Sequence, residues 1–341
     1  MASTNRTQLC ANLINEDCVT EEYELPKCLT FLLIGLHIAL FSFSIVGNIC
    51  TMIISIDRIK TQAQSSGYFL AALAITELFL VLWCIPFSVI SNIINFHWIF
   101  GEFMCSTVGY MQTVCVLMRA FILVASSLNR HRAIWRPIQG RNTTQRVTGL
   151  NISVAFILAL LIPAPIAYFS KLVPAEEQNE TFYCHEVWPS EESKNIFSIL
   201  LMAFSYFLPL IILIVTFSHM AKIIRHKPPG DDILQTLYKR RASSERKMIK
   251  VFLLEFVVYA FCWFPIHVIT IIGDVKPEIY NDVTVHIAWL FAHLIAMSNS
   301  AITPIVVLVL QRPSQARKRL GSQHIVAPEL RNRRMTDSSW L

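Results

Sequence analysis

Residues 196–220 read IFSILLMAFSYFLPLIILIVTFSHM and contain no Asp, Glu, Lys or Arg. An α-helix rises about 1.5 Å per residue, so this run is long enough to cross a hydrocarbon core about 30 Å thick. Six further apolar runs cover residues 29–56, 67–95, 103–128, 147–169, 249–272 and 284–311. The seven runs predict an all-α fold, a bundle of seven transmembrane helices.

The composition agrees with a membrane protein. Hydrophobic residues make up 54% of the chain, charged residues make up 15%, and the mean hydropathy is +0.50. These values favour a polytopic membrane domain over a soluble core. We expect an N-terminal tail at residues 1–28, a seven-helix domain at 29–311 and a short basic tail at 312–341. Neither a catalytic constellation nor a metal-spaced cluster nor a Gly-rich phosphate loop is visible, so we expect no enzyme, no cofactor and no metal ion.

Basic residues gather on one side of the predicted membrane domain. Of the 29 Lys and Arg residues, five lie on one side, one lies inside a run, and 23 lie in the segments around 57–66, 130–146, 221–250 and 312–341. The positive-inside rule makes these segments cytoplasmic, so the N-terminus is outside and the C-terminus is cytoplasmic. The net charge of +6 then reflects membrane topology rather than nucleic-acid binding. The other side is acidic, which would concentrate a cationic ligand.

Cysteines and sequons mark the predicted outer side. Cys105 begins the third run and Cys184 lies in the longest outer loop, so a disulfide between them would tie that loop to a helix end. Asn5 and Asn179 begin Asn-X-Thr sequons on the same side, where glycosylation is possible. Three more cysteines lie in or next to the N-terminal tail, and the sequence leaves their pairing open: Cys10, Cys18 and Cys28.

Short motifs recur in a fixed order along the runs. They are Gly47-Asn48, Leu73-Ala74-Ile75, Trp98-Ile99-Phe100-Gly101 before Cys105, Arg130 with Pro137, Tyr206-Phe207-Leu208-Pro209, Cys262-Trp263-Phe264-Pro265, and Asn299-Ser300 with Pro304. Together they resemble the rhodopsin-like (class A) G-protein-coupled receptors, over roughly residues 30–320. The resemblance implies a multi-pass plasma-membrane receptor that passes ligand binding to a heterotrimeric G protein by rearranging its helices.

Two longer segments indicate a peptide receptor. Residues 184–189, CHEVWP, and residues 292–300, AHLIAMSNS, are similar to segments of neuropeptide Y-like and tachykinin-like receptors. In neuropeptide Y-like receptors, the positions matching Gln112 and His293 bind the C-terminal amide of the ligand, and the position matching Asp274 pairs with an arginine beside it. The resemblance therefore implies a ligand that ends in Arg–aromatic–amide, of the RFamide or RYamide kind.

The chemistry of these side chains agrees with that ligand. A primary amide needs both a donor and an acceptor, which a glutamine supplies, and a guanidinium pairs with a carboxylate. Plainer interpretations are hydrogen-bonded interior residues for the glutamine and histidines, and a solvated helix cap for the aspartate. The expected ligand-binding residues are Gln112, Glu186, Trp263, His267, Asp274 and His293.

The predicted switch departs from the family pattern. The resemblance assigns coupling to Arg130, but the usual acidic neighbour is Asn129, and His131 replaces a tyrosine. The usual Asn-Pro motif of the seventh run reads Thr303-Pro304. Because Asn129 lacks a carboxylate, we expect Glu245 to reach Arg130 instead.

These departures keep alternatives open. The first is a non-signalling or atypically coupled decoy receptor on the same fold. The second is a transporter or channel, although the chain has no internal repeat and no pair of interrupted helices. Expected partners besides the peptide and the G protein are membrane lipids, arrestin and, through Ser339-Trp340-Leu341, a PDZ protein.

Two opposite charges lie within the predicted bilayer. Glu77 stands where the family has an aspartate, and Arg119 stands where a residue usually helps that aspartate to hold a sodium ion. A lone charge in a bilayer is costly, so we expect the two side chains to pair and fix a helix contact. Glu255 is a third ionisable group in the apolar runs. The alternative is a role in conducting protons or ions.

Overall fold

A computed structural model of the chain describes residues 25–62, 65–135, 141–174, 181–225, 232–276, 278–279 and 282–310, with only the backbone described at 61–62, 133–135, 141–144, 223–225 and 232–248. The predicted sequons at Asn5 and Asn179, and the tail with its predicted PDZ motif, lie outside these residues. The side chain of Glu245 also lies outside the described part, so its expected contact with Arg130 stays a prediction.

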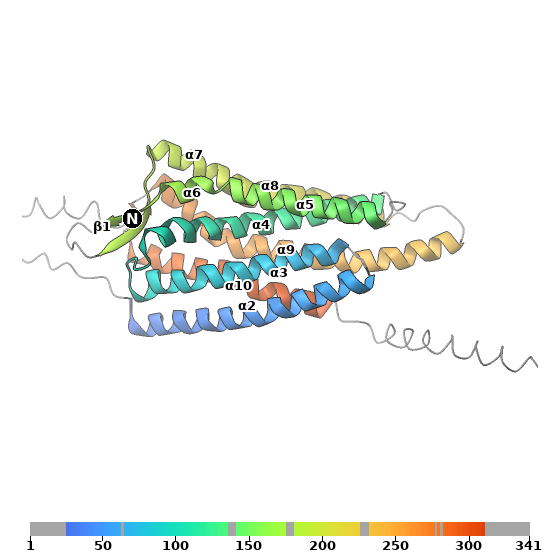
Figure 1. The fold of residues 1–341 in the computed structure, drawn as a ribbon, viewed down its shortest axis with the longest axis horizontal. Coiled ribbons are helices and arrows are strands. Elements are labelled where there is room, and N and C mark those ends of the chain that lie inside the picture. The colour runs from blue at the N-terminus through green and yellow to red at the C-terminus, as the bar shows by residue number, and fades with distance from the viewer. Residues whose placement is uncertain are drawn as a thin grey trace, which may run out of the picture.

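The described residues form seven helical spans, and these helices run along the long axis of the molecule (Figure 1). All seven are long and apolar enough to cross a membrane, as the sequence predicts. The helices are α2 (Lys27–Gln62), α3 (Ser65–Val89), α4 (Gly101–Trp135), α5 (Arg141–Leu161), α6 (Ala164–Phe169), α7 (Glu191–Met202), α8 (Leu208–Arg225), α9 (Asp232–Val275) and α10 (Val283–Leu310). The predicted seven-helix bundle is therefore confirmed, with α5–α6 and α7–α8 as its fourth and fifth spans.

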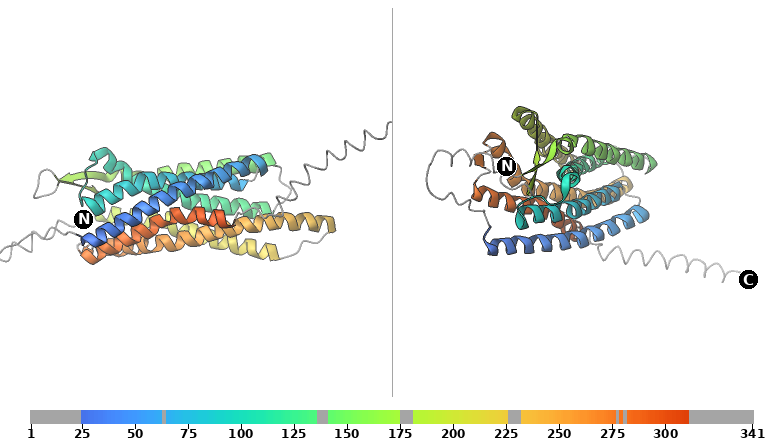
Figure 2. Two further views of the ribbon diagram at one scale, coloured as in Figure 1. Left: turned by 90° about the horizontal axis from the view of Figure 1, so that it is seen from below. Right: turned by 60° about the vertical axis from the view of Figure 1, so that its left-hand side comes forward.

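A β-hairpin adds to the expected all-helical architecture. Strands β1 (Ser170–Pro174) and β2 (Phe182–Glu186) pair antiparallel, with Ser170 opposite Glu186 and Leu172 opposite Cys184. The hairpin lies at one end of the bundle (Figures 1 and 2). We name this the hairpin end, and the opposite end, where α4 carries Arg130, the Arg130 end.

Two π-helical segments interrupt the spans near prolines. Segment η1 (Ile90–Ile94) follows Pro86 of α3, and segment η2 (Ala203–Phe207) precedes Pro209 of α8. A proline removes a backbone donor, and a π-turn shifts the helix face that follows it. In η2 this arrangement buries Ser205 and Tyr206 inside the bundle. A proline inside an apolar run indicates a kink, but it does not predict these wider turns.

The first and last spans approach closely at Gly47. A Cβ atom built on Gly47 would lie 2.7 Å from the Cβ and Cγ atoms of Pro304, so a side chain there would force the helices apart. Next to it, the side-chain amide of Asn48 donates to the carbonyl oxygens of Ser44 and Ser300, at 2.9 Å each. These contacts fix α10, which carries His293, against α2.

Candidate functional site

Gln112 and His293 meet inside the bundle, from α4 and α10. The Nε2 atoms of the two side chains lie 3.5 Å apart, the outer limit of a hydrogen bond. His293 is 4% exposed, and its ring stacks on Trp289 at 5.2 Å and on His37 at 6.3 Å between centroids. The sequence predicted the first pair, whereas His37 gave no signal because a single histidine in an apolar run resembles a core residue. The result is a buried polar cluster that presents amide and imidazole groups.

A second group, on α9 and η2, surrounds Trp263. The His267 ring lies 4.7 Å from the Tyr206 ring and 6.3 Å from the Trp263 ring, and Tyr259 lies 6.2 Å from Trp263. The indole Nε1 of Trp263 and the Nε2 of His267 are buried and have no hydrogen-bond partner among the described residues. An unsatisfied buried donor or acceptor costs about 1–3 kcal/mol. Both groups are therefore poised to bind a polar ligand atom or a water molecule.

Asp274 and Glu186 lie nearer the hairpin end. Asp274, at the end of α9, is half-buried and interacts with Ser198 and Lys194 of α7. The Oε2 atom of Glu186 accepts a hydrogen bond from the indole of Trp188 at 2.8 Å, on an exposed part of the hairpin. Asp274 thus lies in the field of Lys194, which itself forms an ion pair with Glu191 at 4.0 Å.

The hairpin is fixed to the bundle by a disulfide and carries the half-buried imidazole of His185. Cys105 at the start of α4 and Cys184 on β2 are bonded, with their Cα atoms 5.5 Å apart, which confirms the predicted bridge. Burial lowers the pKa of the neighbouring His185 to about 4, and Lys194 adds to the effect. His185 therefore stays neutral at physiological pH.

Arg119 lies at the centre of a network that joins four helices. It forms ion pairs with Glu77 of α3, as predicted, and with Glu255 of α9 at 2.9 Å. Its Nη2 atom also donates to Asn299 and Thr303 of α10, at 3.0 and 3.1 Å. The sequence predicted that all three charged residues lie within the bilayer. It did not predict the contact between Glu255 and Arg119, because the depth of a residue in the bilayer does not reveal which residues its side chain faces.

The switch region shows contacts that the sequence did not predict. The Arg130 guanidinium lies 4.4 Å from the centroid of the Phe252 ring on α9 and is 4% exposed. Asn129 is buried beside it in α4. His131 and His219 are joined by a hydrogen bond of 2.6 Å between Nε2 and Nδ1, which links α4 to α8. Aromatic and imidazole contacts thus join the helices at the Arg130 end.

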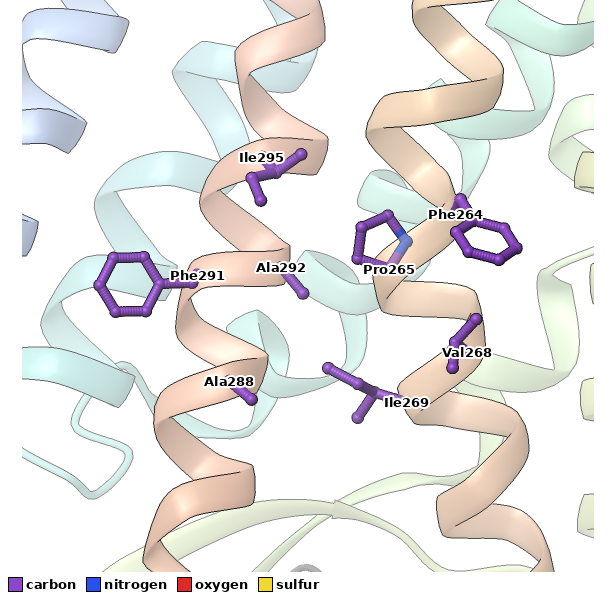
Figure 3. A pocket seen from close by; sticks show the side chains of 8 residues that line it. All are labelled: Phe264, Pro265, Val268, Ile269, Ala288, Phe291, Ala292 and Ile295. Carbon is purple, nitrogen blue, oxygen red and sulfur yellow. The ribbon is translucent and has the colours of Figure 1, made fainter.

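A separate groove of about 450 Å³ lies between α9 and α10 (Figure 3). Its lining consists of Phe264, Pro265, Val268, Ile269, Ala288, Phe291, Ala292 and Ile295. Phe264 is 56% exposed and Ile295 is 42% exposed, so the groove opens on the outside of the bundle. None of the predicted ligand-binding residues lines it. An apolar groove at this depth suits the hydrocarbon chains of membrane lipids rather than an amidated peptide.

Comparison with known proteins agrees with the fold and the motifs. The family described as "7 transmembrane receptor (rhodopsin family)" matches residues 47–306, which is more than half of the chain. The chain therefore belongs to the rhodopsin family of seven-transmembrane receptors. It is a multi-pass protein of the plasma membrane, and its family is one of receptors rather than enzymes.

Its relatives include peptide receptors. The RYamide receptor of Drosophila melanogaster is 31% identical over 300 residues, which cover 86% of this chain and 63% of that receptor. Neuropeptide Y receptor type 1 of Xenopus laevis is 28% identical over 301 residues, 86% of this chain and 79% of the relative. The RYamide receptor of Tribolium castaneum is 27% identical over 285 residues, 80% and 75% of the two chains. The chain thus spans less than two thirds of the fly receptor.

Proposed function

We propose that this chain is a receptor for an extracellular peptide ending in Arg–aromatic–amide, and that it transmits binding to heterotrimeric G proteins. The observation that carries the proposal is the meeting of Gln112 and His293 within 3.5 Å inside the bundle. The similarity to receptors named for RYamide and neuropeptide Y supports the same class of ligand.

The buried polar cluster suits a C-terminal amide. The side chain of Gln112 can donate to the amide oxygen and accept from the amide nitrogen, while a neutral imidazole of His293 does one or the other. A free carboxylate would lack a donor of its own and would bring a charge into a buried site. The site therefore favours the amidated form of a peptide over the free acid.

The rest of the ligand would extend toward the hairpin end, which the charge distribution predicts to be extracellular. The guanidinium of the peptide pairs with Asp274. The aromatic side chain packs near Trp263 and His267, whose unpaired nitrogens bind polar atoms of the peptide or water. Ligand binding then contracts the cluster around Trp263.

Signal transmission follows from the position of Pro265 in α9. The proline removes a backbone hydrogen bond two residues after Trp263, so α9 can bend there. A bend swings the part of α9 that carries Phe252 away from Arg130 and opens a cleft for the G protein at the Arg130 end. This is a shift between two populated states rather than a chemical reaction.

A nucleotide-exchange assay tests the proposal. Amidated and free-acid versions of peptides ending in Arg-Tyr and Arg-Phe are added to membranes that contain the receptor and a panel of G proteins. We expect the amides to stimulate exchange about 10–100 times more potently than the acids, since one or two buried hydrogen bonds are at stake. Gln112→Leu should abolish this preference, whereas Thr107→Val, at a half-buried position of the same helix whose hydroxyl donates to the carbonyl of Phe103, should keep it. Equal potency of amide and acid would refute the site.

A receptor that binds the peptide without coupling is the second candidate. The hydrogen bond between His131 and His219, and the absence of an acid at Asn129, favour it because both alter the helix ends that must separate. The two candidates differ in one measurement. A coupling receptor stimulates nucleotide exchange at the peptide concentrations that saturate binding, whereas a decoy binds the amide with the same Gln112 dependence and gives no exchange with any G protein.

A further inference from the structure

The Arg119 network contains more acid than base. Arg119 and Glu77 are each 1% exposed and Glu255 is 0% exposed, so no bulk water screens them. Two ionised carboxylates and one guanidinium would leave a net charge of −1 in the middle of the bundle. An uncompensated buried ion costs several kcal/mol even after the surroundings relax. The resting receptor therefore needs one more positive charge at this place.

The groups that face the network do not supply it. Those described are Glu77 on α3, Arg119 on α4, Glu255, Tyr259 and Cys262 on α9, and Asn299 and Thr303 on α10. Among them only Arg119 is a cation. Tyr259 lies with its ring 5.9 Å from the guanidinium and donates its hydroxyl proton to the carbonyl of Ser205. The missing charge must come from a proton or a bound cation.

The hydrogen bonds indicate which carboxyl carries a proton. The Oε2 atom of Glu255 accepts from Arg119 at 2.9 Å and from Thr303 at 2.8 Å, whereas among the described residues Glu77 accepts from Arg119 alone. A carboxylate with more donors is the more stable anion. One oxygen of each carboxyl, Oε2 of Glu77 and Oε1 of Glu255, is buried and has no partner among the described residues.

We propose that the network is a binding site for one proton, held on Glu77 in the resting receptor and released when α9 moves. The first half stands on the charge balance and on the hydrogen bonds of the two carboxyl groups. The second half rests on the proposed function, because it requires the swing of α9 about Pro265. Glu255 lies ten residues before Pro265, on the part of the helix that swings.

The step balances in atoms and charge. When Glu255 leaves Arg119, the guanidinium keeps Glu77 as its remaining partner. The O–H bond of Glu77 breaks, the electron pair stays on the carboxylate, and the proton passes to water. Acid conditions therefore favour the resting state, and agonist affinity decreases as the pH decreases.

Infrared spectroscopy of the purified receptor without ligand tests the proton site. We expect a protonated-carboxyl C=O band that disappears in Glu77→Gln and also in Glu255→Gln, where one carboxylate and Arg119 already balance. Glu102→Gln, on an exposed position of α4, should keep the band. Glu77→Asp should shift the frequency of the C=O band, and Glu255→Asp should leave that frequency unchanged. A wild-type spectrum without the band, or a frequency that moves only in Glu255→Asp, would overturn the assignment.

Two further measurements separate the alternatives. If sodium supplied the charge, the band would be absent in sodium and present in matched potassium, and the proposal would be wrong. In the pH range where agonist binding releases the proton, the agonist affinity of the wild type should change by up to about tenfold per pH unit. This pH dependence of the affinity should vanish in Glu255→Gln. The same pH dependence in both proteins would overturn the coupling to α9. Failure of every peptide to bind would refute the proposed function but leave the infrared result standing.

Discussion

The Arg130–Phe252 contact predicts how strongly the resting arrangement is held. The guanidinium lies 4.4 Å from the ring centroid, both side chains are buried, and the contact joins α4 to α9. A cation–π contact is worth about 0.5–1 kcal/mol when exposed and about 2 kcal/mol when desolvated. In Phe252→Leu the cation loses the ring, so the ratio of active to resting receptor should rise about 2- to 30-fold, and ligand-independent nucleotide exchange should rise with it.

The control for this variant is Phe256→Leu. Phe256 is 8% exposed on the same helix, but its ring packs against Phe217 at 6.3 Å and not against Arg130. Both substitutions remove the same atoms from the core. A difference in basal exchange between the two variants therefore reports the contribution of the contact with Arg130. Basal exchange is measured at matched surface expression. If Phe252→Leu and Phe256→Leu change it equally, in receptors that still respond to agonist, Arg130 is held by other contacts and the reasoning is wrong.

Three further predictions follow from single contacts. Asp274→Asn should weaken an Arg-containing peptide far more than its citrulline analogue in a binding assay, because the ion pair is lost; equal losses would refute the pairing. Gly47→Ala should lower the melting temperature of the purified receptor, since the new Cβ lies 2.7 Å from Pro304 and overpacking costs about 1–3 kcal/mol; Gly35→Ala, where nothing lies within 4 Å, should not lower it. The folded state holds the pKa of His185 at about 4, below the unfolded value of about 6.5, so the unfolded state binds the extra proton first. Stability should therefore decrease between about pH 6.5 and 4, and His185→Gln should remove that component from thermal unfolding curves.

The fold was predictable because the bilayer leaves few solutions. An apolar run long enough to cross a membrane must satisfy its own backbone hydrogen bonds, so residues 196–220 and the six similar runs could only be helices or parts of a barrel. The hairpin was not predictable in the same way. Residues 170–174 and 182–186 lie outside the predicted spans, where water satisfies the backbone equally well, so their sequence alone does not require them to pair.

The candidate site was predictable where a single side chain carries the chemistry. The resemblance to neuropeptide Y-like receptors indicated Gln112 and His293 on two separate runs, and the structure brings their nitrogens within 3.5 Å. Contacts that depend on rotation of a helix were missed. Phe252 looks like any other core residue in the sequence, yet it is the ring that covers Arg130. Tyr206 belongs to a motif, but its place beside His267 depends on the π-helical segment η2.

One short stretch of α9 contacts both Arg130 and Arg119 of α4. Asn129 cannot give Arg130 the carboxylate partner that the family pattern leads one to expect. Phe252 and Glu255 are three residues apart on α9, so they share one face of that helix, and they contact Arg130 and Arg119 respectively. A swing of α9 that breaks one contact must also strain the other. One face of α9 therefore contributes to holding the resting state at two points, through Phe252 at Arg130 and through Glu255 at Arg119.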